Sequence, residues 1–300
     1  METNERTQKE LMLLLEQAEN LYFQYRIAEA KVVFHKLLDE NVGRAAYYLY
    51  DISTLSSQED VSEKLSAKET LIKGIKLNDS FSIMKYLNSL DEFEDNLVDE
   101  SVSKKVYAEV FTTENPAMQY EVSTFYYSTL KKKDDGFYWL TQSADAGYWK
   151  AKNMLAIKYF DGKDGVKKDR EKAREMWLDL AKINYEPAIY NGFANAKEFT
   201  TNNPIKIYFL LGNPKIYAKN PMKEYFEKIV NQGFSPALNY KGYCQWNGYK
   251  DYEKNKEEAI SNLKKAADAG NSYAIKNLTT YKKKNDFNFA DWNVARMIYY

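Results

Sequence analysis

The chain has 300 residues, and its 43 Lys and Arg residues balance its 43 Asp and Glu residues, so the formal net charge is zero. This balance gives no support to nucleic-acid binding, because neutralising phosphates requires a basic face. The single cysteine excludes an internal disulfide, so nothing requires an oxidising compartment and we expect a cytoplasmic location. The polar N-terminal segment contains only a short apolar run, 11–15, which cannot serve as a signal-peptide core or a membrane span.

The first segment, 1–43, has the pattern of two amphipathic helices, over 7–26 and 27–39. We interpret it as an N-terminal capping helix pair, with an outer face that meets water. The only histidine, His35, lies in the second helix, and a metal cluster built on several histidines is therefore excluded.

Residues 44–147 show a fainter periodicity. The small residues Ala45, Ser82 and Ala117 recur at intervals of 37 and 35 positions. We interpret the segment as divergent helical repeats, in which only the spacing and the small residues survive.

Two kinds of charged run interrupt the chain. Acidic residues gather at 91–95 and 99–100, and paired carboxylates of this kind can act as acid and base or hold Mg²⁺ or Ca²⁺. The alternative interpretation is a solvated loop or helix end. Three lysines follow one another at 131–133 and again at 282–284, and we expect each run to close a helix, where cations favour the dipole.

A short phrase that begins Ala-Asp-Ala-Gly occurs at 144–151 and returns at 267–274, with weaker copies at 181–188 and 230–237. The alanine that ends each copy recurs at intervals of 37, 49 and 37 positions. Periods in this range indicate a solenoid of stacked helix pairs. The longer step holds one repeat and an insertion, which the Asn-Pro turn signals place near 199–220.

The clearest repeats lie within 148–270. In the best of them, apolar spacing predicts a first helix over 148–160 and a second over 170–183. Glycines within 161–165 end the first helix, and Asp169 is a suitable N-cap for the second helix.

The last segment, 271–300, is predicted to form C-terminal capping helices, over 273–284 and 287–300. The final run 298–300, Ile-Tyr-Tyr, is expected to pack onto the preceding repeat; the alternative is an exposed, adhesive end. The lone Cys244 is interpreted as a small packing residue or a partly exposed thiol.

The best repeat carries small, apolar and loop residues at characteristic positions: Ala151, Leu155, Ala156, Tyr159, Gly162, Gly165, Val166, Asp169, Lys172 and Ala173. With these residues it resembles the Sel1-like repeat, a relative of the tetratricopeptide repeat. The resemblance is strong over 138–194 and 225–284 and faint over 26–137. One departure is Ala156, where the family has glycine, and another is an extra residue before the second loop glycine.

The resemblance implies an all-α fold, a right-handed αα-solenoid superhelix of about eight helix pairs, which binds protein partners on its concave face. It also implies that the first helix of each pair lines that face. The partner-binding residues selected in this way are Lys150, Asn153, Ile157, Phe160, Tyr190, Lys197, Asn239, Tyr243, Trp246, Tyr273 and Lys276. A weaker register upstream adds Arg44, Tyr47, Asp51, Gln119, Ser123 and Tyr126.

These features together predict a non-catalytic interaction scaffold that holds a protein or peptide, with no cofactor and no metal. A narrower alternative is an immunity or inhibitor protein that neutralises a bacterial toxin or effector. A remote alternative from another class is a metal-dependent hydrolase built on the acidic run. The sequence names neither the partner nor the oligomeric state.

Overall fold

The computed structural model is helical throughout the part of the chain that it describes, which confirms the all-α prediction. The described residues are 7–55, 61–93, 96–195, 222–250, 252–284 and residue 298. The chain divides into two compact units: unit 1 comprises 1–56 and 61–173, and unit 2 comprises 57–60 and 174–300. The predicted insertion near 199–220 and the predicted helix over 287–300 fall outside the described residues, except for Ile298.

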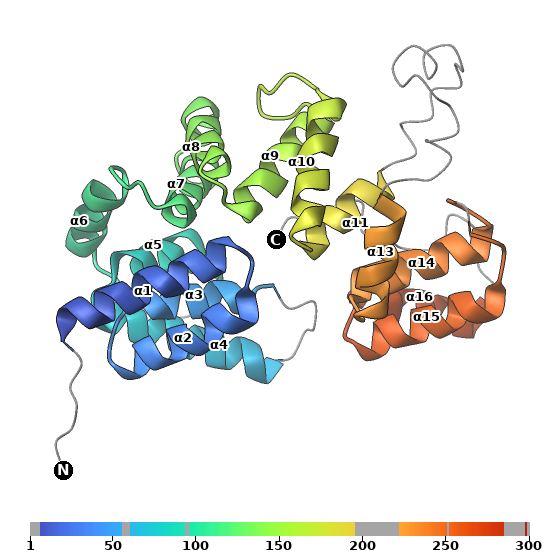
Figure 1. Ribbon diagram of the computed structural model, residues 1–300, viewed down its shortest axis with the longest axis horizontal. Helices are drawn as coiled ribbons and strands as arrows, with labels where there is room; N and C mark the ends of the chain where they lie inside the picture. The colour runs from blue at the N-terminus through green and yellow to red at the C-terminus, as the bar shows by residue number, and fades with distance from the viewer. Residues whose placement is uncertain are drawn as a thin grey trace. The chain divides into compact units, whose positions relative to one another are not determined.

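In unit 1, successive helices pack on one another in pairs (Figure 1). Their bounds are α1 (Gln8–Phe23), α2 (Ile27–Asp39), α3 (Arg44–Ser53), α4 (Val61–Lys76), α5 (Ser80–Asn88), the 3₁₀ helix η1 (Leu90–Glu92), α6 (Glu100–Val110), α7 (Pro116–Ser128), α8 (Lys133–Asp145) and α9 (Trp149–Asp161). First helices of neighbouring pairs also touch, α3 with α5 and α5 with α7. The boundary between the units falls inside α10 (Arg170–Lys182).

The helix ends follow from residues that can satisfy free backbone groups. Thr7 and Glu10 form a capping box at the start of α1. Gly162 ends α9 with a φ of 69°, the left-handed conformation expected of a glycine at this break. Asp169 accepts a hydrogen bond from the backbone N–H of Lys172 at 3.0 Å, which confirms the predicted N-cap.

An aromatic cluster forms much of the core of unit 1. The rings of Phe34 and Tyr48 stack with their centroids 4.7 Å apart, and Tyr22 lies edge-on to Tyr48 at 4.9 Å. Trp149, at the start of α9, lies 5.3 Å from Tyr22 and donates from its indole Nε1 to the Tyr22 backbone carbonyl at 3.2 Å. In an open solenoid each repeat contacts only its neighbours. Here Tyr22 of α1 meets Trp149 of α9, 127 positions later, so unit 1 also has contacts between pairs that are not neighbours in the chain.

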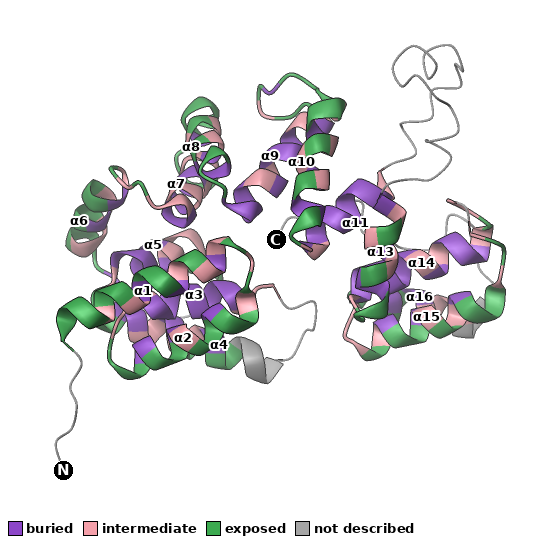
Figure 2. Cartoon of the chain, viewed as in Figure 1, coloured by how far each residue is buried: buried purple, intermediate pink, exposed green. Residues whose placement is uncertain are grey.

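Unit 2 continues the pairing with α11 (Glu186–Ala194), α13 (Met222–Asn231), α14 (Ser235–Asn247), α15 (Lys256–Asp268) and α16 (Ser272–Lys284). Phe193 and Phe226 stack at 4.0 Å in its core. The alanine that ends each copy of the recurring phrase is fully buried, as Ala237 and Ala274 show, which supports its predicted role in close helix packing. Buried residues run along much of α14, the helix that Ala237 belongs to (Figure 2).

The number of helix pairs in the described part of the chain agrees with the prediction of about eight. Among the described helices, none combines the length and the apolar character needed to cross a membrane.

Candidate functional site

The residues that the resemblance selected for the concave face differ widely in exposure. Those on α9 and α11 are buried, and so are the first and last of the set on α14, whereas the two on α16 are exposed. Buried are Lys150, Asn153, Ile157, Phe160, Tyr190, Asn239 and Trp246; Tyr243 is half-buried; Tyr273 and Lys276 are exposed; Lys197 lies outside the described residues. Their role in partner binding stays a prediction.

In unit 1 two of these groove positions bind each other. Lys150 Nζ lies 2.7 Å from Asp51 Oδ1, and both side chains are buried. Lys150 also donates to Thr54 Oγ1 at 3.0 Å. The hydroxyl of Tyr22 donates to Asp51 Oδ2, and that of Tyr148 lies 3.4 Å from the same oxygen.

A second ion pair continues this network through α5 and α7. Lys85 Nζ lies 2.8 Å from Glu121 and 3.8 Å from Asp51. Asn88 donates to the Glu121 carboxylate at 2.8 Å, and Tyr47 does so at 3.4 Å. Each buried carboxylate therefore has a lysine and at least one neutral donor, as buried charges require.

The charges of the network set its protonation. Burial pushes the pKa of Asp51 upward, but Lys150 and Lys85 outweigh burial, so the pKa lies below its usual value. Burial lowers the pKa of Lys85, yet Glu121 and Asp51 outweigh it and the pKa is raised. The network is thus a set of charged, mutually satisfied groups that holds α1, α3, α5, α7 and α9 together.

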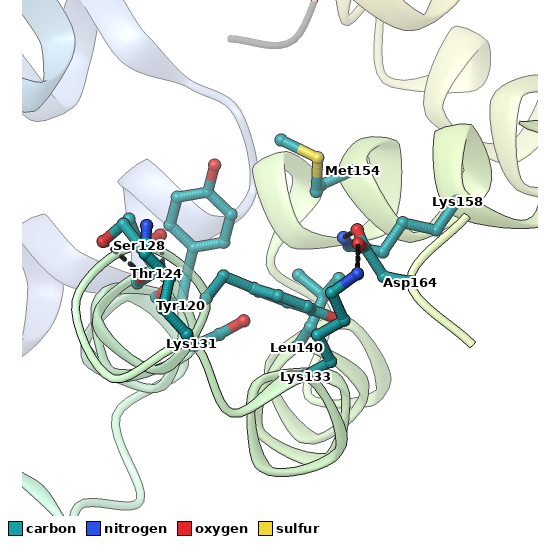
Figure 3. Close-up of a pocket in the computed structure, with 11 residues that line it drawn as sticks. Tyr120, Thr124, Ser128, Lys131, Lys133, Leu140, Met154, Lys158 and Asp164 are labelled. Atoms are coloured by element: carbon teal, nitrogen blue, oxygen red, sulfur yellow. Dashed lines mark hydrogen bonds and ion pairs between the residues drawn. The ribbon is translucent and has the colours of Figure 1, made fainter. Parts of the chain in front are cut away.

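A pocket of about 380 Å³ lies beside this network, among α7, α8, α9 and the loop after α9 (Figure 3). Tyr120 belongs to both regions, because it lines the pocket and its ring lies 5.5 Å from that of Tyr148. Lining residues are Tyr120, Ser123, Thr124, Tyr127, Ser128, Lys131, Lys133, Leu140, Met154, Lys158 and Asp164.

The pocket holds more positive than negative charge. Lys133 and Lys158 share one carboxylate, that of Asp164, at 3.2 and 2.7 Å (Figure 3). Lys158 also lies over the Tyr127 ring, 3.7 Å from its centroid. Lys131 adds a third ammonium group, and it is exposed. Three lysines against one aspartate leave a surplus of positive charge at the pocket.

Tyr127 brings an unused polar group to the same place. Its hydroxyl oxygen is buried and has no hydrogen-bond partner within the described residues. Burial, followed by the negative charges of Asp164 and Asp134, raises the pKa of this phenol, so it remains a neutral donor. A buried donor without a partner costs free energy unless a ligand or water satisfies it. A phenol donor and surplus lysines suit an incoming carboxylate.

The prediction that 131–133 closes a helix is wrong. Because the run was placed at the wrong end of a helix, the pocket could not be inferred from the sequence. α7 already ends at Ser128, Lys131 has a left-handed φ of 56°, and Lys133 begins α8. The run therefore lies at a helix N-terminus, where cations are disfavoured by the dipole. The loop after α9 places the Asp164 carboxylate beside Lys133, and this ion pair offsets the unfavourable interaction with the dipole. The second lysine run, 282–284, lies in the last turn of α16 as far as the structure describes it, and its role at a helix end stays a prediction.

The other candidate residues take structural positions. Asp99 caps α6 by accepting from the Val102 N–H at 2.9 Å, and Glu92 accepts from the Tyr50 hydroxyl at 2.8 Å. His35 is exposed on α2. Cys244 is fully buried, and burial raises the pKa of its thiol to about 12. Within the ranges that the structure describes, no three His, Cys, Asp or Glu residues are placed to hold a metal ion.

Comparison with known proteins adds three repeat assignments. The Sel1 repeat model matches residues 116–148, 149–182 and 235–271. These segments correspond to the pairs α7–α8, α9–α10 and α14–α15. The first match falls mostly in the segment that the sequence showed only as a divergent repeat. No curated protein matches the chain.

Similar solved structures include two repeat proteins. One is c5321, a protective antigen present in uropathogenic Escherichia coli strains that displays an SLR fold, with 19% identity and a TM-score of 0.48 over 86% of this chain. This chain spans only about half of that structure, 53%. The other is a Sel1 repeat protein from Oxalobacter formigenes, with 17% identity, a TM-score of 0.46 and 92% of each chain covered.

The pocket is built by two of the matched segments. Tyr120 through Leu140 come from the first, and Met154, Lys158 and Asp164 come from the second. Sel1 repeats are generally a non-catalytic scaffold and typically mediate protein–protein interaction. Within its all-helical fold, this chain carries three Sel1 repeats, and two of them form the pocket.

Proposed function

We propose that this protein is a non-catalytic interaction protein, and that the pocket between its first two matched Sel1 repeats anchors an acidic side chain of a protein partner. The observation that carries the proposal is the surplus of lysine over aspartate at a pocket that is also lined by Tyr127, whose buried hydroxyl oxygen has no hydrogen-bond partner among the described residues. A carboxylate would accept from that phenol and from Lys131, and Leu140 and Met154 would contact the aliphatic part of the same side chain.

The exposed residues Tyr273 and Lys276 of unit 2 remain candidates for further partner contacts, as the resemblance implies. An inhibitor that neutralises a toxin or effector is a narrower form of the same proposal. It differs only in the identity of the partner. The proposal keeps the cytoplasmic location expected from the single cysteine.

A zero-length carbodiimide cross-linker, applied to the native cells and followed by mass spectrometry, tests the pocket directly, because it joins a lysine amine to a carboxylate in contact with it. We expect partner Asp or Glu residues to be joined to Lys131 and not to Lys132. Lys132 is a matched control, since it is adjacent and exposed but does not line the pocket.

The same partner, once purified, gives the quantitative test. Lys131→Glu should weaken binding by at least about tenfold, which corresponds to ~1.4 kcal/mol. Lys132→Glu makes the same change in charge and should leave binding within about twofold. Equal cross-linking at both lysines, or equal loss in both variants, would contradict the proposal.

A further inference from the structure

Two hydrogen bonds join α11 to a residue 107 positions later in unit 2. The Asn191 side-chain Nδ2 donates to the Ile298 backbone carbonyl at 2.8 Å, and the Ile298 backbone N–H donates to Asn191 Oδ1 at 2.7 Å. Asn191 is fully buried and Ile298 is 4% exposed. One side-chain amide thus binds both polar backbone groups of a single residue.

This geometry selects an extended backbone. In an extended chain the N–H and C=O of one residue point to the same side, as in the hydrogen-bonded pairs of an antiparallel sheet. In a helix they point in opposite directions along the axis. A single amide can meet both groups only in the first case, so Asn191 acts on residue 298 as a neighbouring strand would.

The Ile298 side chain supplies the second half of the interaction. It belongs to the buried apolar cluster of unit 2, together with Ile189, Tyr190 and Phe193 of α11. Burying an isoleucine side chain is favourable because it removes apolar surface from water. The site therefore combines backbone hydrogen bonds, which any residue other than proline can make, with a place for an aliphatic side chain.

Neighbouring helices use buried asparagines differently. Asn239 of α14 and Asn277 of α16 are also buried, and their side chains are hydrogen-bonded to each other at 3.0 Å. Those two amides connect α14 to α16, the first helices of two successive pairs. Asn191 instead binds the backbone of Ile298, which lies outside the helices that the structure describes. Main-chain hydrogen bonds together with a side-chain pocket are also how proteins bind extended peptides.

We propose that Asn191 and the apolar cluster beside it form a binding site for an extended peptide segment that carries an aliphatic residue, and that Ile298 is its internal occupant. A segment of a partner makes the same two hydrogen bonds and places its aliphatic side chain where that of Ile298 lies, so it displaces residue 298. The site lies in unit 2 and does not depend on the pocket of unit 1.

The test uses the full chain and a fluorescent peptide with the sequence of residues 293–300, Asn-Val-Ala-Arg-Met-Ile-Tyr-Tyr. Ile298→Pro removes the backbone N–H and should empty the site. We expect this variant to bind the peptide at least tenfold more tightly than the unaltered protein. A peptide with proline in place of its isoleucine should not bind. Adding Asn191→Leu to Ile298→Pro should abolish binding.

Equal affinity of the unaltered protein and the Ile298→Pro variant, or full binding after Asn191→Leu, would overturn the proposal. Because Asn191→Leu affects a buried residue, a second measurement uses the unaltered protein alone. Excess peptide should increase hydrogen exchange at the Ile298 amide by at least tenfold, and an unchanged rate would equally overturn the proposal.

Discussion

Removing the buried ammonium group of Lys150 tests whether the ion-pair network holds unit 1 together. Lys150→Met keeps most of the side-chain volume but leaves Asp51 with Lys85 at 3.8 Å and the hydroxyls of Tyr22 and Tyr148. Breaking a buried pair by removing one partner costs about 3–5 kcal/mol, because a charge is left uncompensated. Since Lys85 still attracts Asp51, we expect the lower end, about 3 kcal/mol.

Hydrogen exchange measured by mass spectrometry suits this prediction, because it reports each unit separately. A loss of about 3 kcal/mol speeds exchange through opening of unit 1 by about a hundredfold, at ~1.4 kcal/mol for each factor of ten. The effect should appear in both α1 and α9, which the network and Trp149 connect. Peptides from α14 and α15 of unit 2 are the internal control and should not change.

A double-mutant cycle distinguishes the ion pair from simple packing. Asp51→Leu alone leaves Lys150 buried without its carboxylate and should also be destabilising. The double variant, Asp51→Leu with Lys150→Met, should lose clearly less unfolding free energy than the two single variants lose together, because neither charge remains unpaired. Additive losses, or a change below about 1 kcal/mol for Lys150→Met, would refute this account of the network.

Further predictions concern pH, the thiol and the loop glycines. The pKa of Asp51 is lowered in the folded protein, so its contribution to stability is present above the unfolded value of 3.8 and is lost as the pH falls through the folded value. The pKa of Tyr22 is raised by burial and by Asp51, so its contribution to stability is lost as the pH rises above the unfolded value of 10. The thermal stability of unit 1 should therefore fall at both the acidic and the alkaline end of the pH range, and a melting temperature that does not change with pH would contradict this. Cys244 should react with a thiol reagent at pH 8 at least about a hundredfold more slowly than in denaturant, because its pKa is about 12 and it is buried; equal rates would show that it is accessible. In denaturant unfolding, Gly162→Ala should lower the stability by about 1–2 kcal/mol because of its positive φ, and further because the new Cβ would lie 2.9 Å from the Lys168 Cβ. Gly147→Ala, whose new Cβ meets no atom within 4 Å, should lose only the part that comes from the positive φ.

Local signals made much of the fold predictable. The helix break at Gly162, the N-cap at Asp169 and the buried alanines each depend on a few neighbouring residues, because steric fit and backbone capping are decided within one or two turns. The repeat spacing then implied how one pair follows another. These features were read correctly from residue type and interval alone.

The candidate sites depended on contacts between distant segments. Asp51 and Lys150 were both selected as groove positions, yet no periodicity shows that they meet, since 99 residues separate them. The pocket required Asp164 to reach the lysines that precede α8. The partner of Asn191 is Ile298, which lies 107 positions later and outside the described helices. Tertiary contacts of this kind follow from how far the array curves, which the repeat register does not contain.

The contact between α1 and α9 has a consequence for how this protein can change in evolution. An open array of repeats can gain or lose a unit with little effect on the others, because each one touches only its neighbours. In unit 1, an added pair would separate Tyr22 from Trp149 and Asp51 from Lys150. These contacts therefore constrain the number of helix pairs between them, and we expect the segment to tolerate the gain or loss of a pair poorly.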